Sequence, residues 1–182
     1  MTVAVQKILL HICCAPCSIY TIDHLRSEGF EPHGFFYNPN IHPYQEYRRR
    51  LDTLVEHAAN TNLPLTVRDE YDLEGYLTGA VQRLEDRCQY CYETRLRPAA
   101  QEAAEKGYEI FGTTLLISPY QDQEALRRIG NQLAQEYGIA FYDQDLRPGF
   151  REGQKRAREL GLYLQPYCGC IFSERDRYAK KG

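Results

Sequence analysis

The chain of 182 residues lacks any run of about eighteen apolar residues, the length that suggests a membrane-spanning helix. Its opening, MTVAVQKILLHICC, lacks the basic start, long apolar stretch and small-residue cleavage site of a secretory signal. Internal repeats, low-complexity tracts and linkers are also missing. We therefore expect a single domain, residues 1–182, in the cytoplasm with no membrane partner, and long enough to bury a core without disulfides.

A large excess of charge is lacking too, because the formal net charge is only −3. The balance hides an asymmetry: residues 147–182 carry nine Lys or Arg against four Asp or Glu, and residues 1–146 carry thirteen against twenty-one. A basic patch of this kind fits a nucleic-acid backbone, since phosphate contacts are local. A solvated, salt-bridged helix face is the other interpretation.

Strand-like and helix-like patterns alternate along the chain, which predicts a mostly parallel sheet covered by helices on both faces. One helix is expected over residues 43–61, where apolar residues recur at three- and four-residue spacing, and another over residues 120–137, ending at Gly138. The predicted fold class is α/β, Rossmann-like of the HUP and PP-loop kind, with a cysteine-rich C-terminal helical tail. The expected strands are residues 7–12, 32–38, 64–69, 108–116 and 139–145.

Polar segments follow four of these strands, namely HICCAPCS, YNPNIHPYQEY, LLISPYQDQE and DLRPGFREG. In parallel sheets, ligands bind at the carboxyl ends of the strands, in the loops that lead into helices. Because loops over a rigid sheet carry function, we expect this edge of the sheet to hold the site.

The seven cysteines fall in three tight groups. Thiolates two residues apart in a turn or at a helix start can bind one metal or cluster, and sulfur ligation selects zinc or iron–sulfur chemistry. A helix that opens after Pro16 directs its positive end at Cys14 and Cys17, which lowers the pKa of these thiols. Ordinary buried thiols are the alternative. The groups are Cys13, Cys14 and Cys17; Cys88 and Cys91; and Cys168 and Cys170.

Three functions compete for these groups. A zinc-binding nucleic-acid module would use four thiolates and leave three unexplained. A thioredoxin-like thiol–disulfide oxidoreductase would use CAPC, between a strand and a helix, and ignore the remaining groups. An iron–sulfur enzyme uses four thiolates, or three and a carboxylate, for the cluster and keeps a separate dithiol, so only this function employs every cysteine.

Six sequence blocks occur in order along residues 7–178: LLHICCAPCS, FFYNPNIHPYQEYRRR, RCQYCYETRL, TTLLISPYQDQE, GFREGQKRARELGLY and YCGCIFSERDRY. In these blocks the chain resembles the cobalamin-independent epoxyqueuosine reductase family. The resemblance implies an oxidoreductase of tRNA processing that reduces epoxyqueuosine at the wobble position of the anticodon loop to queuosine, the last step of queuosine biosynthesis. It also implies a [4Fe-4S] cluster, an additional iron nearby with a carboxylate among its ligands, and a low-potential electron donor.

Reduction of an epoxide to an alkene removes the oxygen as water, so the reaction needs two electrons and two protons. A cluster passes single electrons, and a dithiol holds two together. Cys168 and Cys170 suit this redox-active role, because a bridge across one residue is strained and easily reduced, and Gly169 makes it tolerable. Ligation of a second metal by the same two thiolates is the alternative.

The matching blocks imply a cluster bound by Cys13, Cys14, Cys88 and Cys91. Cys17 is the reserve ligand. Asp122, in SPYQDQE, is the candidate carboxylate of the catalytic site, and a role at a helix N-terminus fits its position equally well. The proton donor stays open among His11, His42, Tyr120 and Asp122.

Tryptophan is absent from the sequence while tyrosine occurs fifteen times, so stacking on an unpaired RNA base would fall largely to tyrosine. Core packing explains any single tyrosine as well. The predicted RNA contacts are Tyr37 and Tyr44, with Tyr47, Tyr120 and Tyr167 near the same edge, and Arg48, Arg49, Arg50 and the basic tail for the phosphates.

Overall fold

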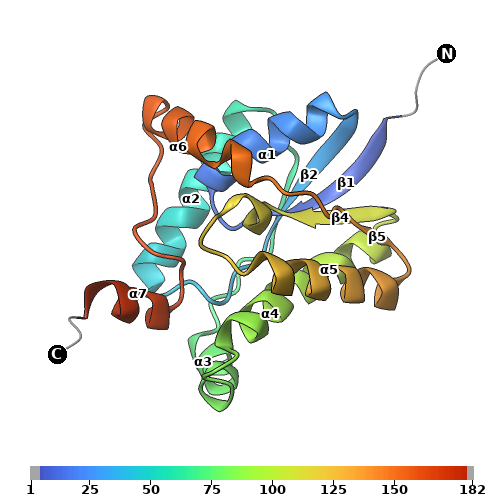
Figure 1. Ribbon diagram of the computed structural model, residues 1–182. Helices are drawn as coiled ribbons and strands as arrows, with labels where there is room; N and C mark the ends of the chain where they lie inside the picture. Colours follow the sequence, from blue (N-terminus) through green and yellow to red (C-terminus); the bar gives the residue numbers. More distant parts are fainter. Residues whose placement is uncertain (1–4, 180–182) are drawn as a thin grey trace.

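The centre of the fold is a five-stranded sheet in the order β3-β2-β1-β4-β5, and all its neighbouring strands pair in parallel (Figure 1). The computed structural model describes residues 5–179. The predicted α/β class with a parallel sheet is therefore confirmed. The strands are β1 (Gln6–His11), β2 (Phe30–Phe36), β3 (Leu65–Val67), β4 (Ile110–Thr113) and β5 (Ala140–Phe141).

Helices cover both faces of the sheet, as parallel strands require (Figure 1). Helix α1 (Ala15–Ser27) packs against α6 (Phe150–Glu159) on one face, and α4 (Arg87–Glu105) packs against α5 (Gln123–Tyr137) on the other. No helix within residues 5–179 has both the length and the apolar character needed to cross a membrane. The remaining elements are α2 (Tyr44–Asn60), α3 (Leu73–Gln82), α7 (Ile171–Tyr178) and the 3-10 turns η1 (Thr114–Ile117) and η2 (Arg147–Gly149).

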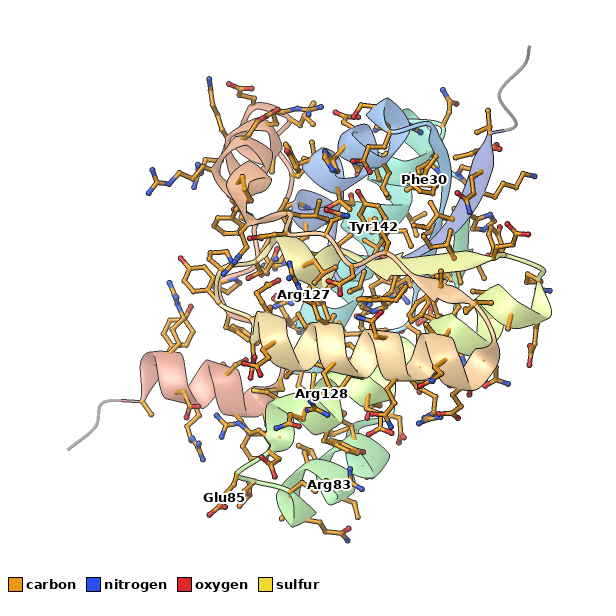
Figure 2. The ribbon with its side chains drawn as sticks, turned by 45° about the vertical axis from the view of Figure 1, so that its right-hand side comes forward. Phe30, Arg83, Glu85, Arg127, Arg128 and Tyr142 are labelled. Carbon is orange, nitrogen blue, oxygen red and sulfur yellow. The ribbon has the colours of Figure 1, made fainter. Side chains whose placement is uncertain are left out.

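The apolar run near the N-terminus forms β1, the central strand of the sheet. Ile8, Leu9 and Leu10 of β1 are all buried, because helices lie over both faces of this strand. At the sheet's far side, Tyr142 packs edge-on against Phe30, with ring centroids 5.7 Å apart, so the segment after β5 lies over the start of β2 (Figure 2). The loops at the carboxyl ends of the strands are thereby held on a rigid base.

Local sequence patterns predict the bounds of the long helices well and the bounds of the outer strands poorly. Helix α5 begins three residues later than predicted, because Asp122 caps it by accepting a hydrogen bond from Ala125 N at 3.0 Å. It ends at Gly138, whose φ of 69° is left-handed, as predicted. The strand predicted over residues 108–116 ends at Thr113, where the hydroxyl accepts from Leu115 N and turns the chain into η1.

The C-terminal segment folds back along α2, as the tail prediction required. Arg50 is only 2% exposed, and its guanidinium donates to the carbonyl oxygens of Tyr167 and Cys168, both at 2.9 Å. His42 N donates to Gly169 O at 2.8 Å. A side chain at position 169 would collide with this junction, since a Cβ there would lie 2.9 Å from Asn40 Nδ2. These contacts bring the last two cysteines to the sheet's carboxyl edge.

Candidate metal centre

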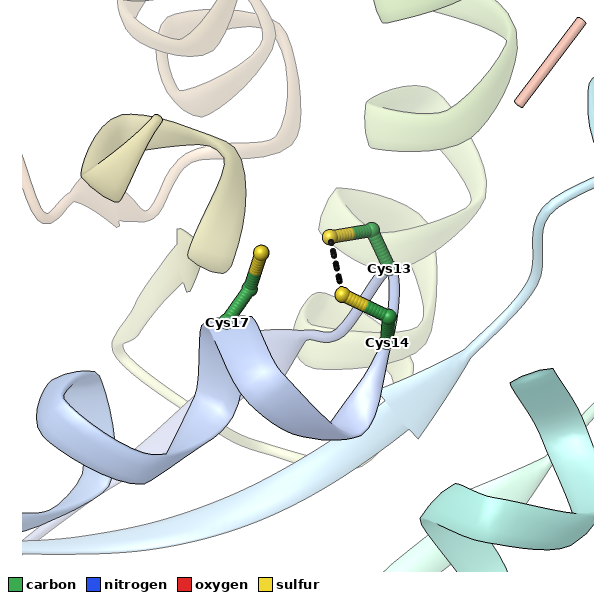
Figure 3. A group of neighbouring side chains, drawn as sticks. All are labelled: Cys13, Cys14 and Cys17. Atoms are coloured by element: carbon green, nitrogen blue, oxygen red, sulfur yellow. Dashed lines mark hydrogen bonds between the residues drawn. The ribbon is translucent and has the colours of Figure 1, made fainter. Parts of the chain in front are cut away.

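Three buried thiols meet where β1 runs into α1 (Figure 3). Cys13, Cys14 and Cys17 are 7%, 1% and 5% exposed, and their Sγ atoms all lie within 4.8 Å of one another. The Sγ atoms of Cys13 and Cys14 are 3.6 Å apart. Cys17, predicted only as a reserve ligand, therefore belongs to this group.

The local sequence explains the convergence of these thiols. Cys14 is the N-cap of α1, with extended backbone angles of φ −167° and ψ 161°, and its side chain makes no capping bond to the helix. Pro16 follows in the first turn, where its missing N–H costs nothing. Cys17 comes three residues after Cys14, so one helical turn returns its side chain to the same side.

The pKa values of the three thiols shift in opposite directions. Hydrogen bonds from Cys14 and Cys17, aided by the Thr114 hydroxyl at 3.3 Å, hold the pKa of Cys13 well below its usual value. Burial raises the pKa of Cys14, and the hydrogen bonds with Cys13 and Cys14 raise that of Cys17. The predicted lowering of the Cys14 and Cys17 pKa by the helix end is thus wrong, because desolvation and thiol contacts outweigh the dipole.

A second group forms from the other four cysteines. Cys91 lies buried on α4 against Tyr76, and Cys170 packs against the same small apolar cluster. Burial raises the pKa of both Cys88 and Cys91, and the nearby charges of Cys168 and Cys170 raise it further. All four carry free thiols, with Cys88 and Cys168 exposed. Residues from opposite ends of the chain therefore share one patch of thiols.

Arg95 of α4 lies between the two groups and is 1% exposed. Its charge lowers the pKa of Cys13 and of Cys91. Burial lowers the pKa of the guanidinium, but the charges of Cys91, Cys168 and Cys13 hold it above its ordinary value. A buried cation among thiols offsets the negative charge that a thiolate-ligated metal group brings with it.

Orphaned polar atoms gather around the thiols. Both amide atoms of Asn40, both ring nitrogens of His42, Arg95 Nη2 and Gln165 Oε1 are buried without a hydrogen-bond partner. Gln165 Nε2 meanwhile donates to Cys14 Sγ at 2.8 Å. Buried polar groups in native proteins are rarely left unpaired. Together with the soft thiolate donors, they fit a metal or iron–sulfur group bound here.

A cavity of about 790 Å³ opens above the thiols, within the size range of ligand pockets. Its floor includes Cys13, Cys17 and Cys168, and Gln121 of the wall donates to Cys168 Sγ at 3.2 Å. Tyr120 stands at its edge and is 84% exposed. Both thiol groups are thereby reachable from one opening, at the sheet edge where a site was expected.

Of the proton-donor candidates, Tyr120 lies on the cavity wall. His11 is fully buried between Thr113 at 2.9 Å and Asn38 at 3.0 Å, and burial lowers its pKa to about 4. Burial likewise lowers the pKa of His42 to about 4. His11 is therefore a neutral structural group of β1 and not a donor to the cavity.

Asp122 has the structural role that the sequence left open. Its Oδ1 accepts from Ala125 N, and its own N–H donates to the Tyr92 hydroxyl at 3.0 Å. It lies outside the group of thiols that converge within 4.8 Å. A ligand role for Asp122 stays a prediction.

The three arginines of α2 that were predicted to contact phosphates differ in their partners and exposure. Arg48 forms ion pairs with Asp69 at 2.6 Å and Asp52 at 2.7 Å, and Arg49 lies over the Tyr163 ring. Arg50 faces inward and is bonded to Glu46 and to the tail, so its RNA-contact prediction is wrong. Burial and a full set of partners leave its guanidinium unable to reach a phosphate.

The tyrosines that were predicted to contact RNA also differ in burial. Tyr47 is buried and donates to Asp69 at 2.9 Å. Tyr37 is partly buried beneath the guanidinium of Arg68, whereas Tyr44 is exposed on α2. Tyr120 and Tyr167 line the cavity. Sequence reasoning missed Arg95 and Gln165, because nothing local distinguishes them from surface residues. The arginines of the cavity wall belong to the basic tail that was predicted to contact phosphates.

The fold and the thiol groups define an α/β protein with a candidate thiolate metal centre beneath a ligand-sized cavity. The sequence profile of the family described as Epoxyqueuosine reductase QueH matches residues 8–176, so the chain belongs to this family. The resemblance found in six blocks is confirmed, and the chain is an enzyme of the reductase class.

Individual relatives cover almost the whole chain. Epoxyqueuosine reductase QueH of Thermotoga maritima is 40% identical over 184 residues, covering 95% of this chain and 93% of that protein. The Dehalococcoides mccartyi protein of the same name is 36% identical over 174 residues, 96% of each chain. A crystal structure described as a predicted subunit of tRNA methyltransferase from Methanocaldococcus jannaschii has a TM-score of 0.54 at 17% identity, over 85% of this chain and 75% of that one. It shares the fold.

Proposed function

We propose that the protein reduces the epoxide of epoxyqueuosine, carried at the wobble position of a tRNA anticodon loop, to give queuosine. The observation that carries the proposal is the cavity lined by thiols of two groups, in a chain of the epoxyqueuosine reductase QueH family. The predicted setting is the cytoplasm, because seven cysteines in three groups suit a reducing compartment.

The proposed cofactor is a [4Fe-4S] cluster. Cys13, Cys14 and Cys17 are the proposed core of its ligand set, supported by their convergence within 4.8 Å. The sequence resemblance adds Cys88 and Cys91, of which we favour Cys91 as the fourth ligand, because burial excludes water and oxygen and Cys88 is exposed. When bound, such a cluster supplies single electrons at low potential.

The chain's own polar groups hold these sulfurs. The Thr114 hydroxyl donates to Cys13 Sγ, and the Gln165 amide donates to Cys14 Sγ. Hydrogen bonds to ligand sulfurs fix their orientation and tune the potential of the group they bind. Arg95 contributes a buried positive charge on the opposite side. We propose that these residues make the thiolates good ligands without closing the cavity.

Cys168 and Cys170 are the proposed redox pair. Two thiols that form a disulfide release two electrons and two protons, the same numbers that convert an epoxide into an alkene and water. Cys168 lies on the cavity floor, and Cys170 begins α7 with its Sγ accepting from Ser173 N at 3.4 Å. An additional iron bound by this pair, with Asp122 nearby, is the proposed alternative, and a low-potential donor restores the electrons.

The function is tested with anaerobically purified protein and tRNA that carries epoxyqueuosine. We expect brown protein that contains iron and sulfide, bleaches with dithionite, and converts epoxyqueuosine to queuosine, measured by mass spectrometry of the digested nucleosides. Colourless protein with stoichiometric zinc would contradict the cofactor assignment. Iron-replete protein that leaves the epoxide intact but reduces insulin disulfides would replace the proposal with a thioredoxin-like function.

A further inference from the structure

The wall of the thiol cavity is basic. Arg151 and Arg158 of α6 and Arg177 of α7 line it, together with uncharged side chains, and none of the lining residues is an Asp or Glu. All three arginines are exposed. Charges of one sign along a concave surface raise the local concentration of the opposite charge, so the wall attracts anions.

Neighbouring arginines on η2, α6 and α7 form ion pairs, in contrast to these three. Arg147 pairs with Asp145 at 2.7 Å, Arg156 with Asp23 at 2.7 Å, and Arg175 with Asp176 at 2.8 Å. Within residues 5–179, Arg151, Arg158 and Arg177 form no salt bridge. Among the basic residues described from Arg147 to Arg177, the unpaired ones therefore lie at the cavity, and the others form ion pairs.

An aromatic side chain stands beside this charge. Tyr120 is 84% exposed, and its ring meets the ring of Phe150 in a T-shaped pair, at 5.9 Å between centroids and an interplanar angle of 82°. One T-shaped neighbour covers at most one face of the tyrosine ring, so on this exposed side chain a face stays available for stacking. Unpaired RNA bases bind by stacking on such rings while arginines follow the backbone.

We propose that this wall is the binding surface for an unpaired RNA loop, with Tyr120 stacking on a base and Arg151, Arg158 and Arg177 contacting phosphates. The surface delivers one nucleotide to the thiols on the cavity floor. The inference rests on the proposed function for the identity of that nucleotide. It moves the expected RNA contacts from α2, where Arg48 and Arg50 are ion-paired, to α6, α7 and the loop after η1. An acidic protein partner with a flat surface would neither fill the concave wall nor stack on the exposed ring of Tyr120.

The charge component is tested with the variant Arg151→Gln/Arg158→Gln/Arg177→Gln and an unmodified RNA hairpin of an anticodon stem and loop. We expect its dissociation constant to rise about tenfold or more in 0.1 M salt, and the salt slope of log K to fall by about two, since each single-strand phosphate contact contributes roughly 0.7. The matched control is Arg156→Gln, on the same helix but ion-paired, which should change affinity less than about twofold. Lysine at all three positions should retain the salt slope.

The stacking component is tested with Tyr120→Ala and Tyr120→Phe. Loss of the ring should weaken hairpin binding about tenfold, and phenylalanine should restore it, because stacking needs the ring and not the hydroxyl. Iron content, measured on the same samples, should stay at the wild-type level. Equal affinity of the wild type and the triple glutamine variant for the RNA hairpin would overturn the proposed RNA surface. The proposal also fails if the glutamine variant loses affinity for an acidic electron-donor protein but keeps its affinity for the hairpin. The proposed function fails separately, if the wild type binds the hairpin through these residues yet converts no epoxyqueuosine.

Discussion

Replacing Cys13 with Ser is expected to remove cluster iron and to lower reductase activity more than about 100-fold, beyond what loss of a supporting partner around a metal costs. Hydrogen bonds from Cys14 and Cys17 hold the pKa of Cys13 well below its usual value, so of the three thiols it gives up its proton to an incoming metal most readily. A serine hydroxyl at this position has almost the same size but stays protonated. Iron per chain and turnover, both measured anaerobically, check the result.

The matched variant is Cys168→Ser, at the exposed end of the proposed redox pair. It should keep most of the iron and lose turnover, because Cys168 lies on the cavity floor and outside the buried group. If both variants lose iron equally, Cys168 is a ligand of the cluster and the division between ligands and redox pair fails. If Cys13→Ser retains full iron, the buried group is not the metal centre.

Replacing Arg50 with Ala should lower the free energy of unfolding by about 3 to 5 kcal/mol, the usual cost of breaking a buried ion pair. The substitution leaves Glu46 without its ion-pair partner, with only the Tyr163 hydroxyl still donating to it, and frees the carbonyl oxygens of Tyr167 and Cys168. For a domain of this size we expect the melting temperature to fall by roughly 6 to 20 °C, measured by calorimetry under anaerobic conditions.

Arg49→Ala is the control for Arg50, since Arg49 stands next in sequence on the same helix but is exposed, with its guanidinium over the Tyr163 ring. It should change the free energy of unfolding by less than about 1 kcal/mol. Accessibility of Cys168 and Cys170 to a thiol reagent should rise in Arg50→Ala only. Equal melting temperatures for the two variants would show that the tail is held by other contacts.

The run Arg48, Arg49 and Arg50 shows what sequence could and could not predict. The helix itself follows from apolar spacing, and the structure agrees to within a residue or two. Yet three identical neighbours point in directions about 100° apart around a helix, and only Arg50 is buried beneath the tail. Which one is buried depends on where residues 163–169 return, and no local pattern records that path.

For the cysteines, too, the sequence predicts one property and not another. Their grouping along the chain was visible, because CC and C-x-x-C spacings are local. The neighbours of each group were not, since Cys88 and Cys91 meet Cys168 and Cys170 only through the packing of α7 near α4. Arg95 gave no signal at all, because an arginine in a polar helix is ordinarily exposed and only the folded core makes it a buried counter-charge.

The cover of the buried thiols has a consequence for how the protein is made. Thr114 and Gln165, which donate to this group, lie about 100 and 150 residues further along the chain. A ribosome adding about 5 to 20 residues per second needs roughly 7 to 30 s to extend the chain from Cys17 to Gln165. Until Gln165 has been added, Cys13, Cys14 and Cys17 lack one of the side chains that donate to them. The nascent chain then presents three closely spaced thiols to oxidants and to any thiophilic metal. Correct loading of the centre therefore depends on the reducing power and metal supply around the ribosome as much as on the finished fold.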